Sequence, residues 1–266
     1  MQIIDSQLLM LAYRSGIFPM ADRRDDPEVF WVEPRLRAIL PLDGFRLSRS
    51  LARTLRRGRF TVTCNAAFEA VMAGCAAPRR ESDETWISGR IAESYRALHV
   101  ERQAHSIECW QPGPDGAPTL VGGLYGVGFD RVFCGESMFS LVPDASKVAL
   151  SWLVAALRRT RCSLLDCQFM TDHLASLGAI EIPQARYLKL LRQAQGPAPD
   201  QSGPAATGAP SASGAAGSDV GEAAGTATAS GAGLPAGFAG LLADAAAAGS
   251  SSSPGNFIAQ SLTQTS

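Results

Sequence analysis

The composition of the chain changes abruptly near residue 194, and this change limits how much of the 266-residue sequence can form a core. From there onward almost every residue is Ala, Gly, Ser, Pro, Thr or Gln, with four acids and no Lys or Arg. Such a segment lacks the large side chains whose burial offsets the entropy lost on ordering a chain. We therefore predict a disordered tail over 194–266, in which only 233–248 has a helix-like pattern, after a folded region that ends near residue 193.

The folded region carries a small excess of positive charge. The whole chain has 24 basic and 25 acidic residues, but without the four acids of the tail the balance becomes 24 to 21. The six cysteines show no CxxC spacing and most have apolar neighbours, and neither a secretory signal nor a run of 18 apolar residues is seen. We expect reduced core thiols in a cytoplasmic protein without a membrane span.

The first 58 residues predict a small N-terminal subdomain. An amphipathic helix over 6–16 precedes two short extended pieces, 29–32 and 37–41. A second helix then begins after Ser48, a good N-cap residue, and ends at Gly58, where glycine permits the C-terminal turn.

Strand patterns predominate from residue 59 to residue 193, which we expect to form one α+β domain. Strands are predicted over 59–64, 105–111, 119–129, 131–139 and 163–169. Helices are predicted over 65–74, 88–99, 144–159 with Asp144 as N-cap, 172–177 and 183–193. Several antiparallel strands, one long helix and one later strand indicate a mixed sheet flanked by helices.

Two polar side chains interrupt the apolar strand LLDCQF, 164–169. Asp166 and Gln168 are two residues apart, so in a strand they share one face, as Glu136 and Met138 would on the strand over 131–139. A buried carboxylate without a partner is costly, so the arrangement requires an explanation. The pattern alone leaves two open: a mutually satisfied buried network, or a carboxylate that orients an amide toward a substrate.

Several familiar chemistries do not fit the sequence. The histidines His99, His105 and His173 are far apart and show no metal-ligand spacing, so we expect no metal. The segment GESMF, 135–139, lacks the second glycine of a serine hydrolase's nucleophile elbow. The segment SLVPDASK, 140–147, lacks a glycine-rich loop for the pyrophosphate of coenzyme A, so we expect no cofactor.

Eight stretches in chain order resemble the leucyl/phenylalanyl-tRNA–protein transferase family. They are GIFP (16–19), ETWI (84–87), HSIE (105–108), LVGGLYGV (120–127), FCGESMF (133–139), DASK (144–147), LLDCQF (164–169) and DHLASLGAIEIP (172–183). The resemblance extends over 6–190 and has no counterpart for the tail. It implies an acetyltransferase-like (GNAT-type) domain over 59–193 that takes aminoacyl-tRNA in place of acetyl-CoA.

The resemblance also implies an activity, namely transfer of Leu or Phe from its tRNA to the N-terminal α-amino group of a protein. Acceptors usually begin with Arg or Lys, and the product is marked for N-degron proteolysis. The expected partners are leucyl-tRNA or phenylalanyl-tRNA and protein or peptide N-termini. The pattern leaves open the acceptor residue, the preference between Leu and Phe, the oligomeric state and the role of the tail.

Roles for individual residues follow from the same resemblance. Asp166 holds and polarises Gln168, whose carbonyl accepts a hydrogen bond from the attacking amine. Glu136 attracts a basic acceptor, and Trp86 stacks near the terminal adenosine of the tRNA, although Met20 stands where the family often has a second aromatic. The pocket for the transferred side chain is formed by four apolar residues: Leu124, Phe133, Met138 and Leu165.

The helix over 48–58 and its exit independently suggest contact with a nucleic acid. Their basic residues are Arg49, Arg53, Arg56, Arg57 and Arg59. Such a row of charge suits the phosphates of an acceptor stem, and a merely solvated basic face is the plain alternative. Two other classes of protein therefore compete with a transferase: a CoA-dependent N-acetyltransferase and a non-catalytic tRNA-binding module.

Overall fold

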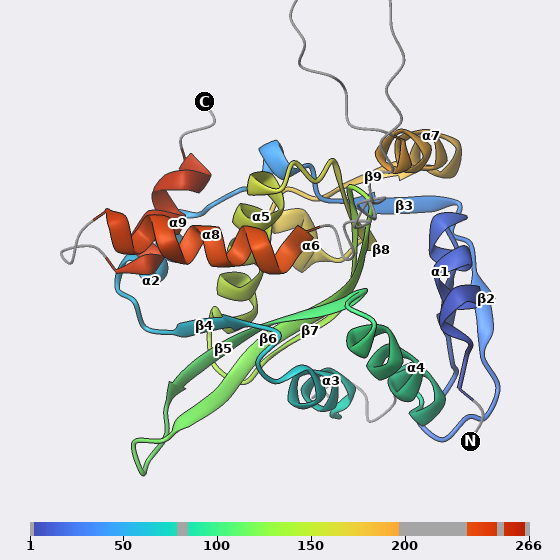
Figure 1. Cartoon of the computed structure of the whole chain (residues 1–266), viewed down its shortest axis with the longest axis horizontal. Helices are drawn as coiled ribbons and strands as arrows, with labels where there is room; N and C mark the ends of the chain where they lie inside the picture. The colour runs from blue at the N-terminus through green and yellow to red at the C-terminus, as the bar shows by residue number, and fades with distance from the viewer. Residues whose placement is uncertain (1–2, 79–84, 197–232, 249–252, 264–266) are drawn as a thin grey trace, which may run out of the picture.

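A seven-stranded mixed sheet forms the centre of the protein in the computed structural model, which describes residues 3–78, 85–196, 233–248 and 253–263 (Figure 1). The strand order is β4-β5-β6-β7-β8-β3-β9, with β7 and β8 parallel and the other neighbours antiparallel. The bounds are β3 Leu36–Ile39, β4 Thr61–Cys64, β5 Ala104–Pro112, β6 Pro118–Phe129, β7 Val132–Ser140, β8 Leu164–Gln168 and β9 Ile180–Pro183. The strands β1 (Phe18–Met20) and β2 (Phe30–Val32) pair separately.

Helices cover both faces of the sheet, and each face has its own apolar cluster. The helices are α1 Ser6–Arg14, α2 Arg49–Arg56, α3 Phe68–Ala76, α4 Gly89–Val100, α5 Ala145–Arg159, α6 Asp172–Ser176, α7 Gln184–Gln195, α8 Leu234–Ala247 and α9 Pro254–Thr263, with a short 3-10 turn, η1, at Leu42–Gly44. Buried residues of α5, α2, α8 and α9 form the first cluster, and those of α1, α3, α4 and α7 form the second. The predicted α+β class with a mixed sheet flanked by helices is confirmed.

The N-terminal segment does not stand apart from the sheet as predicted. The strand β3 lies between β8 and β9, where Leu40 also donates its backbone N–H to the carbonyl oxygen of Leu165 at 2.9 Å. The strand β9 was not predicted from the sequence, so its pairing with β3 was not predicted either. The proposed boundary at residue 58 therefore separates β3 from the other strands of the sheet to which it belongs.

Asp144 occupies the N-cap position of α5 but does not cap it with its side chain. Its backbone is left-handed, with φ +71°, a conformation that Asp tolerates better than most residues. Its carboxylate accepts a hydrogen bond from Thr54 Oγ1 at 3.1 Å instead. This contact ties the start of α5 to α2, whereas Ser48 caps α2 as predicted, by accepting from the N–H of Leu51.

The prediction of a disordered tail over 194–266 is wrong for the two segments that form α8 and α9. The helix α8 packs onto α5, and α9 packs onto α2 and α5. Phe238 of α8 lies 5.2 Å from Trp152 of α5 between ring centroids. The buried apolar residues of these helices include Leu234, Phe238, Leu241, Ile258 and Leu262. The predicted helix-like piece at 233–248 corresponds to α8.

Small residues explain how a segment with so few large side chains can pack. A Cβ at Gly237 would lie 2.6 Å from the carbonyl oxygen of Ala156, and one at Gly255 would lie 2.2 Å from that of Leu55. The two backbones therefore approach α5 and α2 more closely than any larger residue allows. Ser253 also donates its hydroxyl to the carbonyl oxygen of Arg56 at 3.1 Å, near the C-terminal end of α2.

Two further expectations concern reduced core thiols and the lack of a membrane span. All six cysteines are free thiols, and four of them are buried in the two apolar clusters. Among the described residues, none of the helices combines the length and the apolar character that a membrane crossing requires.

Candidate active site

A β-bulge in β7 decides which side chains meet at the candidate site. Tyr125 pairs with Ser137 and Gly126 pairs with Gly135, so Glu136 is an extra residue without a partner on β6. A bulge reverses the alternation of side chains beyond it. Glu136 and Met138 were predicted to share a face, but the bulge places them on opposite faces of the sheet.

The parallel strands β7 and β8 pair only as far as Cys134 and Asp166. Figure 1 shows β4–β7 continuing on one side of this point and β8, β3 and β9 forming the other part of the sheet. Beyond the last pair, the side chains of Glu136 and Gln168 connect the two strands: Gln168 Nε2 donates to Glu136 Oε2 at 3.0 Å. The candidate site therefore lies where the two parts of the sheet join.

Asp166 is completely buried and fully paired. Arg37 of β3 donates Nε to Asp166 Oδ1 at 2.9 Å and Nη2 to Oδ2 at 2.6 Å, and Tyr187 donates its hydroxyl to Oδ2 at 2.9 Å. An ion pair in this bidentate geometry satisfies a carboxylate that would otherwise be costly to bury. Asp166 is therefore held in place by side chains from β3 and α7.

The contact between Asp166 and Gln168 differs from the expected one. Asp166 Oδ1 accepts a hydrogen bond from the backbone N–H of Gln168 at 2.8 Å, and the Gln168 side-chain amide donates to Glu136. Gln168 has a left-handed backbone, with φ +63°, which costs a non-glycine residue about 1–2 kcal/mol. Asp166 thus stabilises a strained backbone, whereas Glu136 orients the amide group.

Glu136 is 9% exposed and belongs to a chain of buried polar groups. Tyr95 of α4 donates its hydroxyl to Glu136 Oε2 at 3.0 Å, and the hydroxyls of Tyr95 and Tyr13 are hydrogen-bonded to each other. Burial raises the pKa of Glu136 to about 7, although its hydrogen bonds oppose the shift. This carboxyl group therefore changes its charge near neutral pH.

The four apolar residues predicted to form the side-chain pocket lie together. Leu124 pairs with Met138 across β6 and β7, and Phe133 pairs with Leu165 across β7 and β8. All four pack in the cluster on the α5 face, where Met138 is only partly buried. The polar groups of Asp166 and Glu136 lie on the other face, with the cluster that contains α1, α4 and α7.

Trp86 and Met20 pack partly buried against the second cluster. The N–H of Ala21 donates to the carbonyl oxygen of Trp86 at 3.3 Å, so the end of β1 lies beside Trp86. Met20 faces Phe30 in the register of β1 and β2, and Phe30 is 44% exposed. Cross-strand partners share a face of the sheet, so an aromatic ring does accompany Met20.

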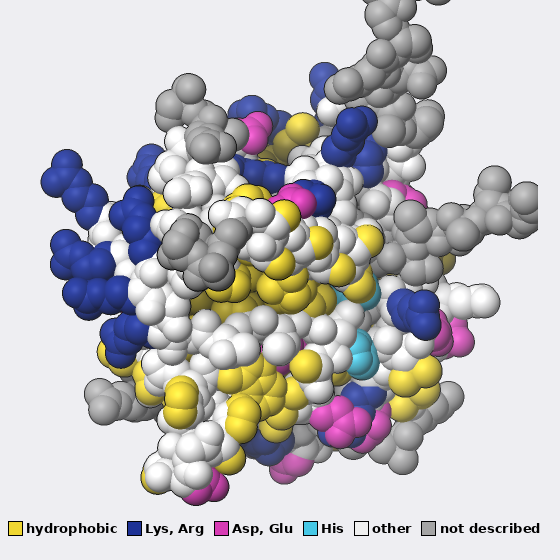
Figure 2. Space-filling view, turned by 60° about the vertical axis from the view of Figure 1, so that its left-hand side comes forward, with side chains coloured by type: hydrophobic (Ala, Val, Ile, Leu, Met, Phe, Trp, Pro, Cys, Tyr) yellow, Lys and Arg dark blue, Asp and Glu magenta, His cyan; other side chains and the backbone are white. Residues whose placement is uncertain are grey.

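The predicted basic residues form an exposed row on α2 and its exit. Arg49, Arg53, Arg56, Arg57 and Arg59 are all exposed, whereas Leu51 and Leu55 of the same helix are buried. Figure 2 shows Lys and Arg side chains gathered at the left-hand edge of the face that it presents. These arginines make none of the contacts that hold Asp166, Gln168 and Glu136 together. Two further arginines, Arg79 and Arg80, lie outside the described residues.

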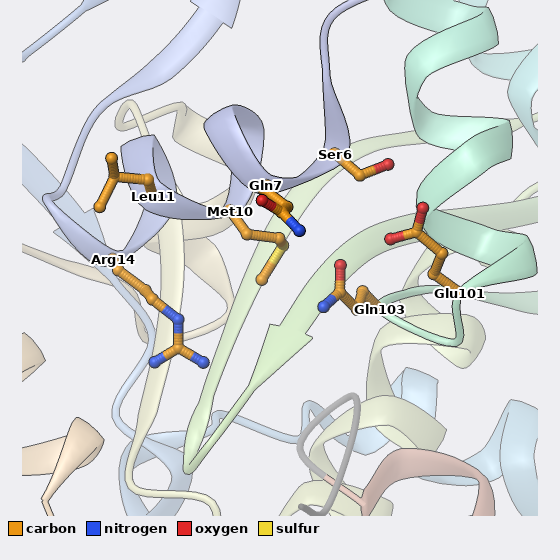
Figure 3. A pocket seen from close by; sticks show the side chains of 7 residues that line it. All are labelled: Ser6, Gln7, Met10, Leu11, Arg14, Glu101 and Gln103. Atoms are coloured by element: carbon orange, nitrogen blue, oxygen red, sulfur yellow. The ribbon is translucent and has the colours of Figure 1, made fainter.

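A separate surface cavity of about 300 Å³ lies between α1 and the turn after α4 (Figure 3). It is lined by Ser6, Gln7, Met10, Leu11, Arg14, Glu101 and Gln103. None of the residues predicted for the site lines it, and Arg14 is paired with Asp130. Within the described ranges, no group of three or more His, Cys, Asp or Glu side chains could hold a metal ion.

Two residues central to this geometry, Arg37 and Tyr187, were missed by the sequence reasoning. Arg37 is 1% exposed. An arginine at the start of the extended piece over 37–41, which is otherwise apolar, was the available signal for a buried partner of Asp166. Tyr187 lies on α7, 21 residues from Asp166 in the chain, and nothing in the sequence pattern connects the two. His173 takes part in none of the hydrogen bonds described above for Asp166, Gln168 and Glu136, and burial lowers the pKa of its imidazole.

Comparison with known proteins places this chain in a family. The family model described as leucyl/phenylalanyl-tRNA protein transferase matches residues 39–192, and the model of that family's N-terminal domain matches residues 3–35. A leucyl/phenylalanyl-tRNA–protein transferase of Novosphingobium aromaticivorans is 64% identical over 99% of this chain and 97% of its own length. One of Rhizorhabdus wittichii is 56% identical over 74% of this chain and 77% of its own.

A solved structure, that of L-PGS from Bacillus licheniformis, is similar over 64% of this chain and 55% of its own, at 12% identity and a TM-score of 0.33. A likeness this distant supports no conclusion. The match to the Novosphingobium relative covers nearly the whole chain, so the tail, for which the resemblance had no counterpart, does have one there.

The family matches define the class of protein as an aminoacyltransferase. The chain belongs to the leucyl/phenylalanyl-tRNA protein transferase family. The predicted family and the predicted enzyme class, an aminoacyltransferase, are confirmed. The two family models meet between residues 35 and 39, earlier than the boundary predicted at residue 58.

Proposed function

We propose that this chain transfers Leu or Phe from aminoacyl-tRNA to the N-terminal α-amino group of proteins, usually those that begin with Arg or Lys. The observation that carries the proposal is the Asp166–Gln168–Glu136 arrangement at the junction of the sheet, in a chain that belongs to this family. Its products are proteins marked for N-degron proteolysis, and its place of action is the cytoplasm.

The chemistry requires alignment more than activation. An aminoacyl ester is already activated, and an α-amine with a pKa of about 8 is partly neutral near neutral pH. Holding amine and ester in a reactive geometry can supply about 7–11 kcal/mol in favourable cases. The bond between the amine nitrogen and the ester carbonyl carbon forms, the bond to the ribose oxygen breaks, and the proton from nitrogen passes to that oxygen.

Gln168 is the residue that we assign to the alignment of the amine. Because its Nε2 donates to Glu136, its carbonyl oxygen lies on the other side of the amide and can accept a hydrogen bond from the attacking amine. A neutral amide is a weak base, so Gln168 orients the amine and does not deprotonate it by itself. Glu136 adds negative charge above its pKa of about 7, which favours a basic acceptor residue.

The remaining substrate contacts are assigned to three surfaces. Leu124, Phe133, Met138 and Leu165 form the apolar wall for the transferred side chain. Trp86 stacks on the terminal adenosine, because an aromatic ring offers any base a stacking surface. The five arginines of α2 and its exit bind phosphates of the acceptor stem.

We also propose an acetyltransferase-like (GNAT-type) catalytic domain, supported by the mixed sheet and the parallel β7–β8 pair.

A peptide panel tests the proposal. The purified chain is incubated with Leu-tRNA or Phe-tRNA carrying a radiolabelled amino acid and with peptides that begin with Arg, Lys, Asp, Glu or Ala. We expect label on the Arg and Lys peptides.

The variant Gln168→Ala should bind tRNA normally and transfer the amino acid at least about 100-fold more slowly, which is the loss expected for a misplaced reactant. Wild-type protein that labels none of the peptides would refute the function.

A further inference from the structure

We propose that Arg37 is a positioning residue for the transfer reaction: through Asp166 it holds the backbone of Gln168 in the conformation that presents its side chain to the acceptor amine. The inference deepens the proposed function and rests on it for the identity of the reacting groups. Arg37 lies on β3 and touches neither Gln168's amide group nor, in our assignment, the substrates.

The guanidinium of Arg37 is fixed on every side. Its Cζ atom lies 4.7 Å from the centroid of the Phe18 ring and 4.4 Å from that of the Tyr187 ring. Its Nη1 donates to the carbonyl oxygen of Gly16 at 3.0 Å, and its Nε and Nη2 both donate to Asp166. A planar guanidinium suits this site because it stacks between rings and forms two parallel bonds to a carboxylate, which lysine cannot do.

Asp166 passes this constraint on to Gln168. The carboxylate cannot rotate while Arg37 and Tyr187 hold both of its oxygens, so Oδ1 stays 2.8 Å from the backbone nitrogen of Gln168. Ala38, the neighbour of Arg37, is the register partner of Gln168 across β3 and β8. The left-handed φ of +63° at Gln168 therefore persists because its N–H has a charged acceptor in a fixed place.

The direction of the Gln168 side chain depends on that backbone conformation. A residue that continued β8 with an ordinary extended φ would place its side chain differently, since strand side chains alternate strictly between faces. In the left-handed conformation the amide crosses from β8 to Glu136 on β7. The pathway thus runs from Arg37 to Asp166, to the Gln168 backbone, and then to the amide.

A simple structural ion pair is the competing explanation, and substitution by apolar residues separates the two. A buried ion pair can often be replaced by well-packed apolar residues without loss of stability. The double variant Arg37→Met with Asp166→Leu therefore removes the acceptor of the Gln168 N–H while offering the core a replacement. The single variant Arg37→Lys keeps the charge and loses the bidentate geometry. Arg14→Met, which removes an exposed ion pair with Asp130, is the control.

Four quantities are measured for each variant: the thermal midpoint, tRNA affinity, kcat and KM for Leu transfer to an Arg-peptide, and deuterium exchange at the Gln168 amide. For Arg37→Lys we expect unchanged tRNA affinity and KM, a kcat lower by about 100-fold, and exchange at Gln168 faster by about 10-fold. The double variant should have a thermal midpoint close to that of wild type but should not recover the wild-type kcat. Arg14→Met should match wild type in all four.

Two results would overturn the proposal: Arg37→Lys with wild-type kcat, or a folded double variant with wild-type kcat. If Arg37→Lys does not fold, the double variant decides. If wild-type protein transfers no amino acid at all, the proposed function fails, while exchange at the Gln168 amide still shows whether Arg37 holds that backbone. Unchanged exchange in a folded Arg37→Lys variant would reject the positioning role independently of turnover.

Discussion

Glu136 is the residue whose protonation connects the candidate site to stability. Burial raises its pKa to about 7 from an ordinary value of 4.5, so the folded protein holds this proton more tightly than the unfolded chain does. Its stabilising contribution is complete below about pH 4.5 and is lost as the pH rises through about 7. Three other side chains depend on the same group: Gln168 and Tyr95, which donate to it, and Tyr13 behind Tyr95.

We predict that Glu136→Gln removes this pH dependence, because the amide stays neutral at every pH. Relative to the variant, wild-type protein should lose about 2–3 kcal/mol in the free energy of unfolding between pH 5 and pH 8. Urea unfolding at several pH values measures the difference. Glu181→Gln, which alters an exposed acid on β9, serves as the control and should follow wild type. Parallel pH profiles for wild type and Glu136→Gln would contradict the assignment.

At the scale of elements, α2 combines a buried apolar face with an exposed row of arginines. Leu51 and Leu55 anchor the helix against α5, Thr54 binds Asp144 at the start of α5, and Ser253 binds the carbonyl oxygen of Arg56 near its end. A helix anchored by its buried face and near its C-terminal end presents its charges in a fixed arrangement. Such an arrangement suits a duplex whose phosphates have fixed spacing.

Replacing two arginines of α2 should therefore weaken tRNA binding in a salt-dependent way. For Arg53→Ala with Arg57→Ala we expect lower affinity and a slope of log K against log salt that is smaller by about 1–2. Titration of tRNA at several salt concentrations measures both. Arg186→Ala with Lys189→Ala on α7 removes the same charge from exposed positions and is the matched control. An unchanged slope in the α2 variant would remove this helix from the tRNA surface.

At the scale of the whole molecule, α8 and α9 belong to the core. Their apolar residues complete the cluster around α5, and Arg159 forms an ion pair with Asp244 at its edge. The two helices contact α5 and α2 but supply no residue to the candidate site. We therefore expect their loss to affect stability more than chemistry.

The variant Phe238→Ala tests this packing. Phe238 is 5% exposed against Trp152, and large-to-small changes in a core typically cost about 3–5 kcal/mol. We expect the thermal midpoint to fall by about 5 °C or more, with kcat for Leu transfer close to wild type. Leu242→Ala on the same helix, where the side chain is 40% exposed, should change the midpoint little. Equal midpoints for Phe238→Ala and wild type would show that α8 does not dock in solution.

Features that depend on neighbouring residues could be predicted from the sequence, whereas features that depend on pairing or packing could not. The spacing of Asp166 and Gln168 indicated a special strand, and the run of arginines around Arg53 indicated an exposed basic helix, because both signals are local. The bulge at Glu136 was not predictable in this way, since one extra residue changes the face of Met138 without changing the pattern of the strand. The docking of α8 was also not predicted. Its small residues, such as Gly237, let its backbone approach α5 closely, and this close packing compensates for the lack of large side chains.

The sequence by itself determined the α+β class, the order of most elements and, through collinear motifs, the family. Those features depend on patterns of neighbouring residues and on composition. Only the tertiary structure decided that Arg37 neutralises Asp166, that Asp166 binds the backbone of Gln168, and that Glu136 orients its amide. These contacts join residues up to 129 positions apart, so they exist only once the strands of the sheet have been placed side by side.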